Sequence, residues 1–197
     1  MGPSMLDRLS QHPLEIDRLA RKFAELHTAM HDAHGSGLQD QKTSLRRMIE
    51  FAGENLSDVA RRAALIRLDS QPDGDAICHG DMHPGNVLLT ARGGVVIDWM
   101  TASRGDAASD VARTRFLLRD RGPPPYMRRA QRTLLALARR RFFSVYLRQY
   151  QRLRRLDRRE VDAWRLPILA ARLGEGIEAE RAALQGAIRR DLDRASR

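Results

Sequence analysis

The chain has 197 residues, of which 42% are hydrophobic, and it carries a formal net charge of +10 at neutral pH. This length can bury a sizeable core, and no apolar run approaches the roughly 18 residues that a membrane helix needs. A single cysteine, Cys78, excludes an internal disulfide and is typical of a reducing cytoplasm, so we expect a cytoplasmic protein and interpret Cys78 as a small apolar strand residue.

The positive charge is concentrated in the second half of the chain. Residues 1–100 carry 11 basic and 14 acidic side chains, whereas residues 101–197 carry 24 and 11. Fourteen arginines lie between positions 119 and 159, a density that could serve a nucleic-acid surface. The near-absence of lysine favours a solvated helix face instead, and we expect no nucleic-acid partner. A core stripe is predicted from residues at helical spacing: Leu134, Leu137, Phe142, Phe143, Tyr146, Leu147 and Tyr150.

The first 75 residues are predicted to be helical. Apolar spacing and breaker residues predict helices over 7–11, 14–34, 44–55 and 57–68, followed by a turn at 71–74. The inward face of the long second helix is predicted to consist of Ile16, Leu19, Phe23, Leu26 and Met30. His27, His31 and His34 recur in that helix at spacings of four and three, which raises a metal site. No carboxylate or cysteine completes a tetrahedral set, so surface or capping histidines are favoured.

The segment 76–113 contains the chemically informative residues. Strands are predicted over 76–78, 87–90 and 95–99, a loop over 79–86, and a helix over 107–119 that Asp106 caps. The loop reads His79-Gly80-Asp81-Met82-His83-Pro84-Gly85-Asn86. Asp81 thus precedes the amide of Asn86 by five residues, and a second carboxylate, Asp98, ends an apolar strand.

Phosphoryl transfer needs this set of side chains. One carboxylate positions the attacking hydroxyl, while an amide and a second carboxylate hold Mg²⁺ on the nucleotide phosphates. Turn formation explains the composition of the loop but not a carboxylate at the end of a buried strand. Burying Asp98 without a partner would cost several kcal/mol, and a bound cation is such a partner.

The order His-Gly-Asp, His-Pro-Gly-Asn and Ile-Asp-Trp, followed by Gly105-Asp106-Ala107-Ala108-Ser109-Asp110-Val111-Ala112-Arg113, resembles the aminoglycoside phosphotransferase and choline kinase group of small-molecule kinases. The resemblance implies a predominantly helical α+β fold: the C-terminal lobe of a protein-kinase-like fold, with a small β-hairpin carrying the catalytic segment. It implies ATP as co-substrate, Mg²⁺ as cofactor and a small-molecule hydroxyl as acceptor. The implied site residues are Asp81 as catalytic residue, Asn86 and Asp98 as metal ligands, and His79, His83 and Asp110 as supports of the loop.

Residues 114–197 are expected to form a helical subdomain on the substrate side. The sequence predicts a rigid break at 122–125, helices over 126–153 and from about 158, a kink at Pro167, an end at 174–176 and a last helix over 178–193. Under the resemblance, candidates for binding a cationic acceptor are Glu160, Asp162, Glu175 and Glu178. The positive charge of this half argues against a polycationic antibiotic, and the acceptor stays open.

A kinase of the resembled type also has an N-terminal β-lobe, which supplies a loop over the phosphates and a strand lysine. The chain's two lysines, Lys22 and Lys42, lie in a helical pattern and at a loop-to-helix junction, and no Gly-rich loop lies between β-branched runs. We therefore expect residues 1–197 to form the C-terminal lobe alone. Such a lobe would transfer phosphate weakly or not at all and could self-associate through the surface that the β-lobe covers.

Two other functions stay open. A non-catalytic module that captures a ligand or partner could retain the same lobe. Metal-assisted hydrolysis is a second possibility, because the H-x-D-x-H spacing of the loop could place a transition metal among His79, Asp81, His83 and Asp98. That centre explains neither Asn86 nor the 105–113 segment.

Overall fold

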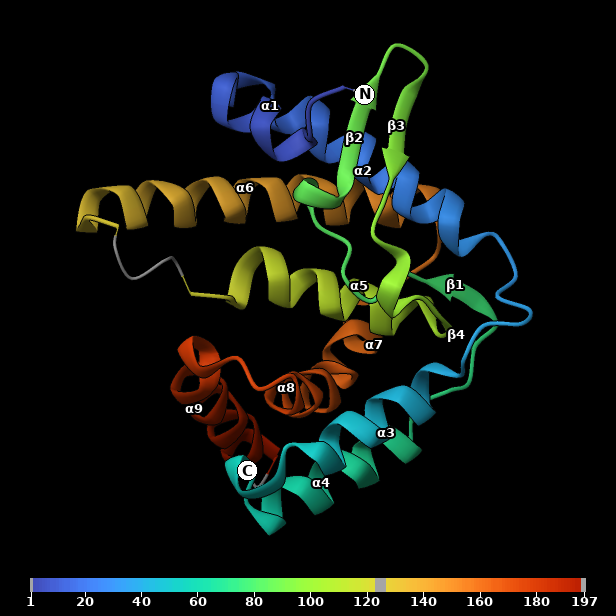
Figure 1. The fold of residues 1–197 in the computed structure, drawn as a ribbon, viewed down its shortest axis with the longest axis vertical. Coiled ribbons are helices and arrows are strands. Elements are labelled where there is room, and N and C mark those ends of the chain that lie inside the picture. Colours follow the sequence, from blue (N-terminus) through green and yellow to red (C-terminus); the bar gives the residue numbers. More distant parts are fainter. Residues whose placement is uncertain (1, 123–126, 196–197) are drawn as a thin grey trace.

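The computed structural model of the chain describes residues 2–122 and 127–195, and Pro123–Pro125 of the predicted break lie outside them. Helices dominate, and two small antiparallel sheets complete the predicted helical α+β fold (Figure 1). The α-helices are α1 (Met5–Gln11), α2 (Ile16–His31), α3 (Gln41–Phe51), α4 (Asp58–Asp69), α5 (Ala107–Arg115), α6 (Arg129–Leu153), α7 (Arg158–Ala163), α8 (Arg165–Gly174) and α9 (Glu178–Ala195). The strands are β1 (Ala76–Cys78), β2 (Val87–Thr90), β3 (Gly93–Val96) and β4 (Ser103–Gly105).

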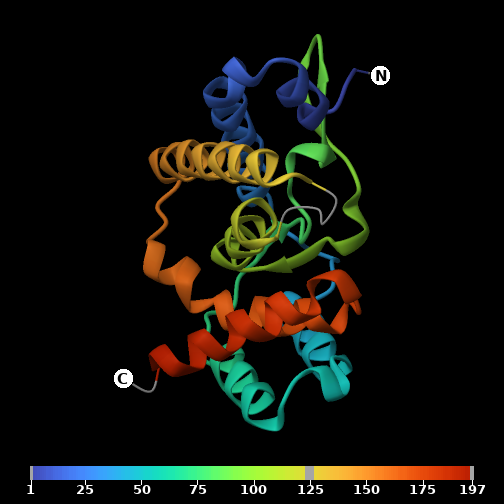
Figure 2. The same ribbon diagram turned by 90° about the vertical axis from the view of Figure 1, so that its left-hand side faces the viewer.

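The helices form two groups on either side of α5. In both views α2 and α6 lie on one side of α5, while α3, α4, α8 and α9 lie on the other (Figures 1 and 2). The β2–β3 hairpin projects on the α2 side beside the start of the chain, where the main-chain N–H of Leu89 donates to the carbonyl of Pro3 at 2.9 Å. The segment 79–86 runs from β1, which contacts α5, to this hairpin.

Polar residues begin several helices, as the sequence predicts for Asp106. The side chains of Ser57 and Asp106 accept hydrogen bonds from main-chain N–H groups in the first turns of α4 and α5. Ser4 does the same for α1, in a capping box with Asp7. Each cap satisfies a donor that the helix itself leaves without a partner.

Aromatic packing joins α2 to α6. Phe23 lies at 0% exposure and meets the rings of Phe142 and Tyr146 edge-to-face, with centroids 5.5 and 5.3 Å apart. Such pairs stabilise a core beyond their buried area. The predicted core stripe is wrong for Leu134 and Leu137, which are 70% and 56% exposed. Helix α6 has 25 residues against 16 in α2, so its first turns, with Leu134, extend past their partner.

Ion pairs between α2 and α6 neutralise part of the excess positive charge of the second half of the chain. Arg141 of α6 pairs with Asp17 of α2, and Arg154 pairs with Asp32 at 2.6 Å. Basic residues of the second half thus meet acidic residues of the first, which supports a structural interpretation of the arginine-rich stretch. None of the described helices is both long and apolar enough to cross a membrane.

Several element boundaries differ from the prediction. The third predicted strand, 95–99, ends at Val96, and the chain then enters a 3₁₀ turn over Trp99–Thr101. Helix α5 ends at Arg115 and continues as a π-helical turn over Phe116–Asp120. The break between α7 and α8 falls at Trp164, so Pro167 lies in the first turn of α8, where a missing N–H costs nothing, and does not kink a helix. Strand β4, which pairs with β1, is not predicted.

Candidate functional site

The loop 79–86 connects β1 to β2 and depends on a glycine. Gly80 has φ +79°, and a Cβ there would lie 2.8 Å from the carbonyl oxygen of Thr101. Only glycine combines that backbone conformation with so close an approach. Thr101 in turn donates its hydroxyl to the carbonyl of His79 at 2.8 Å. The turn that precedes Asp81 is thereby held against the segment that follows Asp98.

Asp81 and Asn86, five residues apart in the loop, lie in contact. The Asn86 amide nitrogen donates to the Asp81 carbonyl at 3.0 Å and to its Oδ2 at 3.3 Å. Asn86 is 8% exposed, and no described residue donates to its Oδ1. The amide is therefore oriented by Asp81 and keeps one oxygen available for a ligand.

Ile97 ties Asp98 to the same loop. The Ile97 N–H donates to the carbonyl of Asn86 at 3.0 Å, and the Ile97 carbonyl accepts from Nε2 of His79 at 3.0 Å. These two bonds hold the chain immediately before Asp98 between both ends of the loop. The three residues predicted to serve phosphoryl transfer are thus gathered around one segment.

The environment of Asp98 differs from the prediction. Its backbone adopts φ +64° and ψ +63°, the only positive φ at a non-glycine among residues 2–122 and 127–195. Its side chain is exposed, without a hydrogen bond or ion pair to any described residue. The prediction that Asp98 ends a buried strand and loses its water is wrong. The strand ends two residues earlier, and the carboxylate is exposed. A strained backbone at an acidic residue whose side chain is exposed to solvent is a feature found at functional sites.

Nearby groups keep the Asp81 carboxyl in its ionised form. Burial alone would raise its pKa, but His83, with Nε2 at 3.4 Å from Oδ2, and the guanidinium groups of Arg113 and Arg172 hold the pKa below its usual value. Asp81 is therefore ionised at neutral pH. An ionised carboxylate can accept a hydrogen bond from a substrate hydroxyl and later its proton.

His79 and His83 support the loop with both of their ring nitrogens. Nδ1 of His79 accepts from the N–H of Asp81 at 3.2 Å while its Nε2 holds Ile97. Nδ1 of His83 accepts from the N–H of Gly85 at 3.1 Å while its Nε2 faces Asp81. Neither ring leaves a nitrogen free for a metal, so this arrangement does not favour the hydrolytic metal centre.

Asp110 lies behind the loop and binds its main chain. Its carboxylate accepts hydrogen bonds from the N–H groups of His79 at 2.6 Å and Gly80 at 2.9 Å. Asp110 is 1% exposed and lies in the first turn of α5. This is the geometry of a brace that fixes the start of the loop.

Two histidines of α2 complete the surroundings of Asp110, and sequence analysis missed their role. Nε2 of His27 and Nε2 of His31 each lie 3.2 Å from Oδ2 of Asp110. Their Nδ1 atoms meet the hydroxyls of Tyr146 at 2.8 Å and Tyr150 at 2.6 Å. Because a carboxylate only accepts, both imidazoles donate from Nε2 and accept from a tyrosine through Nδ1.

The prediction of surface histidines holds only for His34, which is exposed beside Asp75. His27 and His31 are buried, and Asp110 supplies the carboxylate that the local sequence lacks. The ligand atoms of this triad lie within 4.8 Å of one another. Every polar atom in it already has a hydrogen-bond partner, so the network is satisfied without a cation.

The pKa values of the network follow from its burial. Burial lowers the pKa of His27 to about 4, and the nearby imidazole of His31 acts in the same direction. Burial alone would raise the pKa of Asp110, but hydrogen bonds from His27 and His31 hold it well below its usual value. At neutral pH the brace is therefore an ionised carboxylate that receives hydrogen bonds from a neutral His27.

The acidic candidates for a cationic acceptor do not converge. Glu160 accepts from the N–H of Asp157 at 2.7 Å in the capping box of α7, and Asp162 and Glu178 pair with arginines. Glu175 approaches the loop, but Arg113 holds it at 2.7 Å and Arg172 binds it as well. The four carboxylates are thus committed to cations or main-chain N–H groups of the chain itself.

Arg113 is a further residue that the sequence did not single out. Its Nε donates to the carbonyl of Gly80 at 3.0 Å while its other end pairs with Glu175. Arg113 is buried, with 9% of its surface exposed, and it connects α5 and α8 to the loop. Its charge also lies close enough to Asp81 to lower the pKa of that carboxyl.

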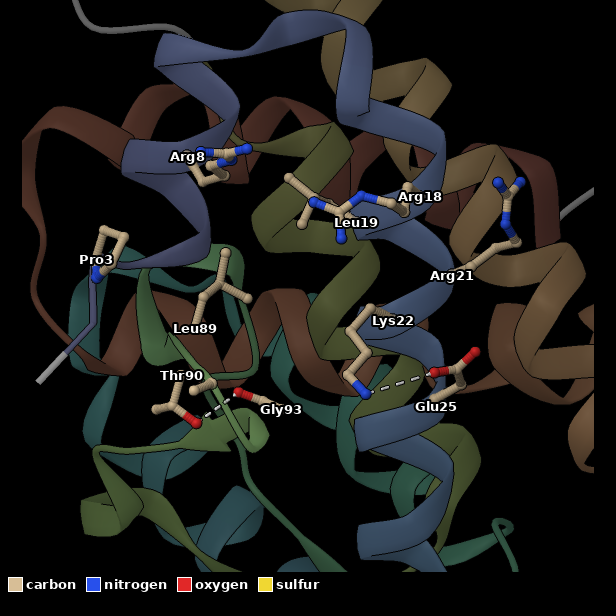
Figure 3. A pocket seen from close by; sticks show the side chains of 11 residues that line it. Pro3, Arg8, Arg18, Leu19, Arg21, Lys22, Glu25, Leu89, Thr90 and Gly93 are labelled. Carbon is tan, nitrogen blue, oxygen red and sulfur yellow. Dashed lines mark hydrogen bonds and ion pairs between the residues drawn. The ribbon is translucent and has the colours of Figure 1, made fainter.

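A separate surface hollow of about 560 Å³ lies between α1, α2 and the β2–β3 hairpin (Figure 3). Three of its cations have partners: Arg8 and Arg18 pair with Glu15, and Lys22 lies 3.9 Å from Glu25. Figure 3 shows Arg21 directed away from the hairpin. No residue of the loop 79–86 borders this hollow, so it is not part of the candidate site.

Comparison with protein families gives a match to the phosphotransferase enzyme family over residues 2–143. The matched segment contains the loop 79–86, Asp98 and Asp110, which the structure brings together. It also contains His27 and His31 of the brace, but it ends before Tyr146. A search of curated proteins finds no match.

Proposed function

We propose that this chain, which belongs to the phosphotransferase enzyme family, transfers the γ-phosphate of ATP to the hydroxyl of a small molecule with the help of Mg²⁺. Its helical α+β fold would then be the C-terminal lobe of a protein-kinase-like fold. The observation that carries the proposal is the gathering of Asp81, Asn86 and the unpartnered Asp98 around Ile97.

Asp81 is proposed to orient the acceptor hydroxyl and to take its proton late in the reaction. Its ionised state and its contacts with His83 and Asn86 suit this role, because both contacts fix the direction of the carboxylate. The brace on His79 and Gly80 keeps the preceding main chain from moving. Positioning is the larger part of catalysis in phosphoryl transfer, so these contacts contribute to the rate.

The side chains present fit a magnesium ion. Asn86 offers an amide oxygen that no described residue binds, and Asp98 offers an exposed carboxylate. Oxygen ligands in small number, with phosphate oxygens and water completing the shell, are what Mg²⁺ prefers. When bound, the ion would offset negative charge on the phosphate oxygens.

Titration of the chain with ADP in the presence and absence of Mg²⁺ tests this proposal. We expect calorimetry to detect binding with Mg²⁺, loss of binding with a chelator, and at least about tenfold weaker binding in Asp98→Asn. Asp75→Asn, which removes another exposed carboxylate elsewhere in the chain, is the matched control. Binding that depends neither on Mg²⁺ nor on Asp98 would overturn the metal assignment.

A non-catalytic binding module is the alternative function. It would bind ligand at the same lobe without transferring phosphate, and its behaviour would not depend on Asp81. ADP release that requires an added acceptor and disappears in Asp81→Asn would favour the enzyme. Binding without release in any condition would favour the module. Self-association, measured by light scattering, is a further expectation under either function.

A further inference from the structure

A cavity of about 300 Å³ lies directly beside the catalytic loop. Its walls come from α3, α5, α8 and residues 100–103, and Gly80 of the loop lines it as well. Arg113 also lines it and, through its bond to Gly80, connects the cavity with the residue before Asp81. The volume lies at the lower end of the range for small-molecule pockets. A compound the size of a single sugar ring fits such a space.

A buried hydroxyl in the wall has no partner. Ser109 is 0% exposed, and its Oγ makes no hydrogen bond to any described residue. Buried polar atoms nearly always have a hydrogen-bond partner, so an unpartnered one at a cavity indicates a place for a polar ligand atom. Ser109 precedes Asp110, and its position is therefore fixed by the brace.

The acidic side chains of the cavity are not available to a cation. Asp110 already accepts four hydrogen bonds, two from the main chain and two from His27 and His31. Glu175 is bound by two arginines. A cationic ligand would find no unpaired carboxylate among the described residues of this wall, and burying it there would cost free energy.

The cavity does offer a cation. Arg47 of α3 lines it, is exposed, and makes no hydrogen bond or ion pair with any residue in the described part of the chain. The rest of the α3 and α8 walls is largely apolar, with Leu45, Met48 and Ile168. A guanidinium without a partner, on the rim of an apolar cavity, suits a carboxylate or phosphate group in two-pronged contact.

We infer that this cavity binds the acceptor and that the acceptor is a small hydroxyl compound carrying an anionic group, which Arg47 holds while Ser109 bonds a second polar atom. The inference rests on the proposed phosphotransfer, because it assigns the cavity to the acceptor of that reaction. It reverses the expectation of a cationic acceptor that the acidic candidates of the C-terminal half suggested.

Four compounds with one sugar ring test the assignment by calorimetric titration: glucose, glucuronate, glucose 6-phosphate and glucosamine. We expect glucuronate or glucose 6-phosphate to bind at least about tenfold more tightly than glucose, and glucosamine to bind no better than glucose. Arg47→Gln should abolish the preference for the anionic compound and leave the affinity for glucose unchanged. Arg62→Gln, an exposed arginine of α4 outside the cavity, is the matched control.

Ser109→Ala separates binding from folding. Removing an unpartnered buried hydroxyl should leave the thermal midpoint unchanged or raise it, yet weaken binding of the anionic compound several-fold. Tightest binding of glucosamine, no binding by any of the four compounds, or an anion preference that survives Arg47→Gln would overturn the inference.

The two proposals can fail separately. If Mg²⁺-dependent ADP binding holds and the anion preference is absent, the acceptor inference is wrong and the proposed function stands. If the anion preference depends on Arg47 but ADP binding depends neither on Mg²⁺ nor on Asp98, the cavity is a ligand site and the proposed phosphotransfer is wrong.

Discussion

The carboxylate of Asp110 accepts a hydrogen bond from the main-chain N–H of His79 at 2.6 Å, although the two residues lie 31 positions apart. Through this bond the first turn of α5 holds the start of the loop 79–86. The same carboxylate receives two imidazole N–H groups from α2. The loop is thereby tied to two helices at a single buried acceptor.

Asp110→Asn should destabilise the protein by about 3 kcal/mol or more. An amide presents one acceptor oxygen where four donors converge, and its NH₂ group would face other donors, so several buried hydrogen bonds are lost. Urea unfolding measures the change. The control is Asp75→Asn, at an exposed contact with His34, expected to stay within about 0.5 kcal/mol of wild type. A cost for Asp110→Asn as small as that of the control would show that Asp110 does not brace the loop.

Gly80→Ala should destabilise the protein by about 2 kcal/mol or more. The left-handed backbone at Gly80 penalises any side chain, and the new Cβ would lie 2.8 Å from the Thr101 carbonyl oxygen. Gly122→Ala is the comparison, because a Cβ there meets nothing within 4 Å and a smaller unfolded-state entropy offsets any loss. Thermal unfolding of the two variants gives the difference. Equal midpoints would mean that the loop relaxes around the added methyl group.

Asp98 allows the backbone and the carboxylate to be tested separately. Asn tolerates the left-handed conformation about as well as Asp, whereas Ala pays about 1 kcal/mol more. We expect Asp98→Asn to keep the stability of wild type and Asp98→Ala to lose about 1 kcal/mol, while both weaken Mg²⁺-dependent nucleotide binding. Parallel urea unfolding and calorimetry separate the two effects. If the Asn variant binds nucleotide as wild type does, the carboxylate is not a metal ligand.

Much of the fold could be predicted from the sequence because many helices and strands are specified by residues close together in the chain. Strands β1 and β2 lie where the prediction placed them, between the Gly-rich turns that delimit them. Strand β4 has the sequence Ser-Arg-Gly, which lacks apolar alternation, and it exists through pairing with β1. A strand of that kind is defined by its partner and not by its own residues.

The candidate site likewise has a part that is specified by neighbouring residues and a part that depends on residues far apart in the sequence. The loop 79–86 could be predicted because its chemistry is written in eight consecutive residues. His27 and His31 could not, since the carboxylate that they bind is 83 and 79 positions away. Without a visible partner, polar residues in an amphipathic helix are assigned to the surface. The exposure of Asp98 was missed because the apolar pattern continues through Ile97, whereas the strand itself ends at Val96.

The buried brace also predicts how stability changes with pH. The pKa of His27 is about 4 in the folded protein, lowered by burial, against about 6.5 for a free imidazole. Between these values the unfolded chain binds a proton that the folded protein does not, so stability falls as the pH falls through this window. Asp110 acts in the same sense at lower pH, since its pKa also lies well below the usual value. The groups that face His27 are His31, Asp110, Tyr146 and His79.

His27→Gln should therefore flatten the pH dependence of the free energy of unfolding between about pH 4 and pH 6.5. The wild type should lose about 3 kcal/mol across the window from this residue, and the variant should lose that slope although it is less stable at pH 7. Urea unfolding at half-unit pH intervals gives both curves. His34→Gln controls for the removal of one imidazole from the unfolded chain. If the slope of His27→Gln matches that of wild type, His27 is not held neutral by burial against the brace.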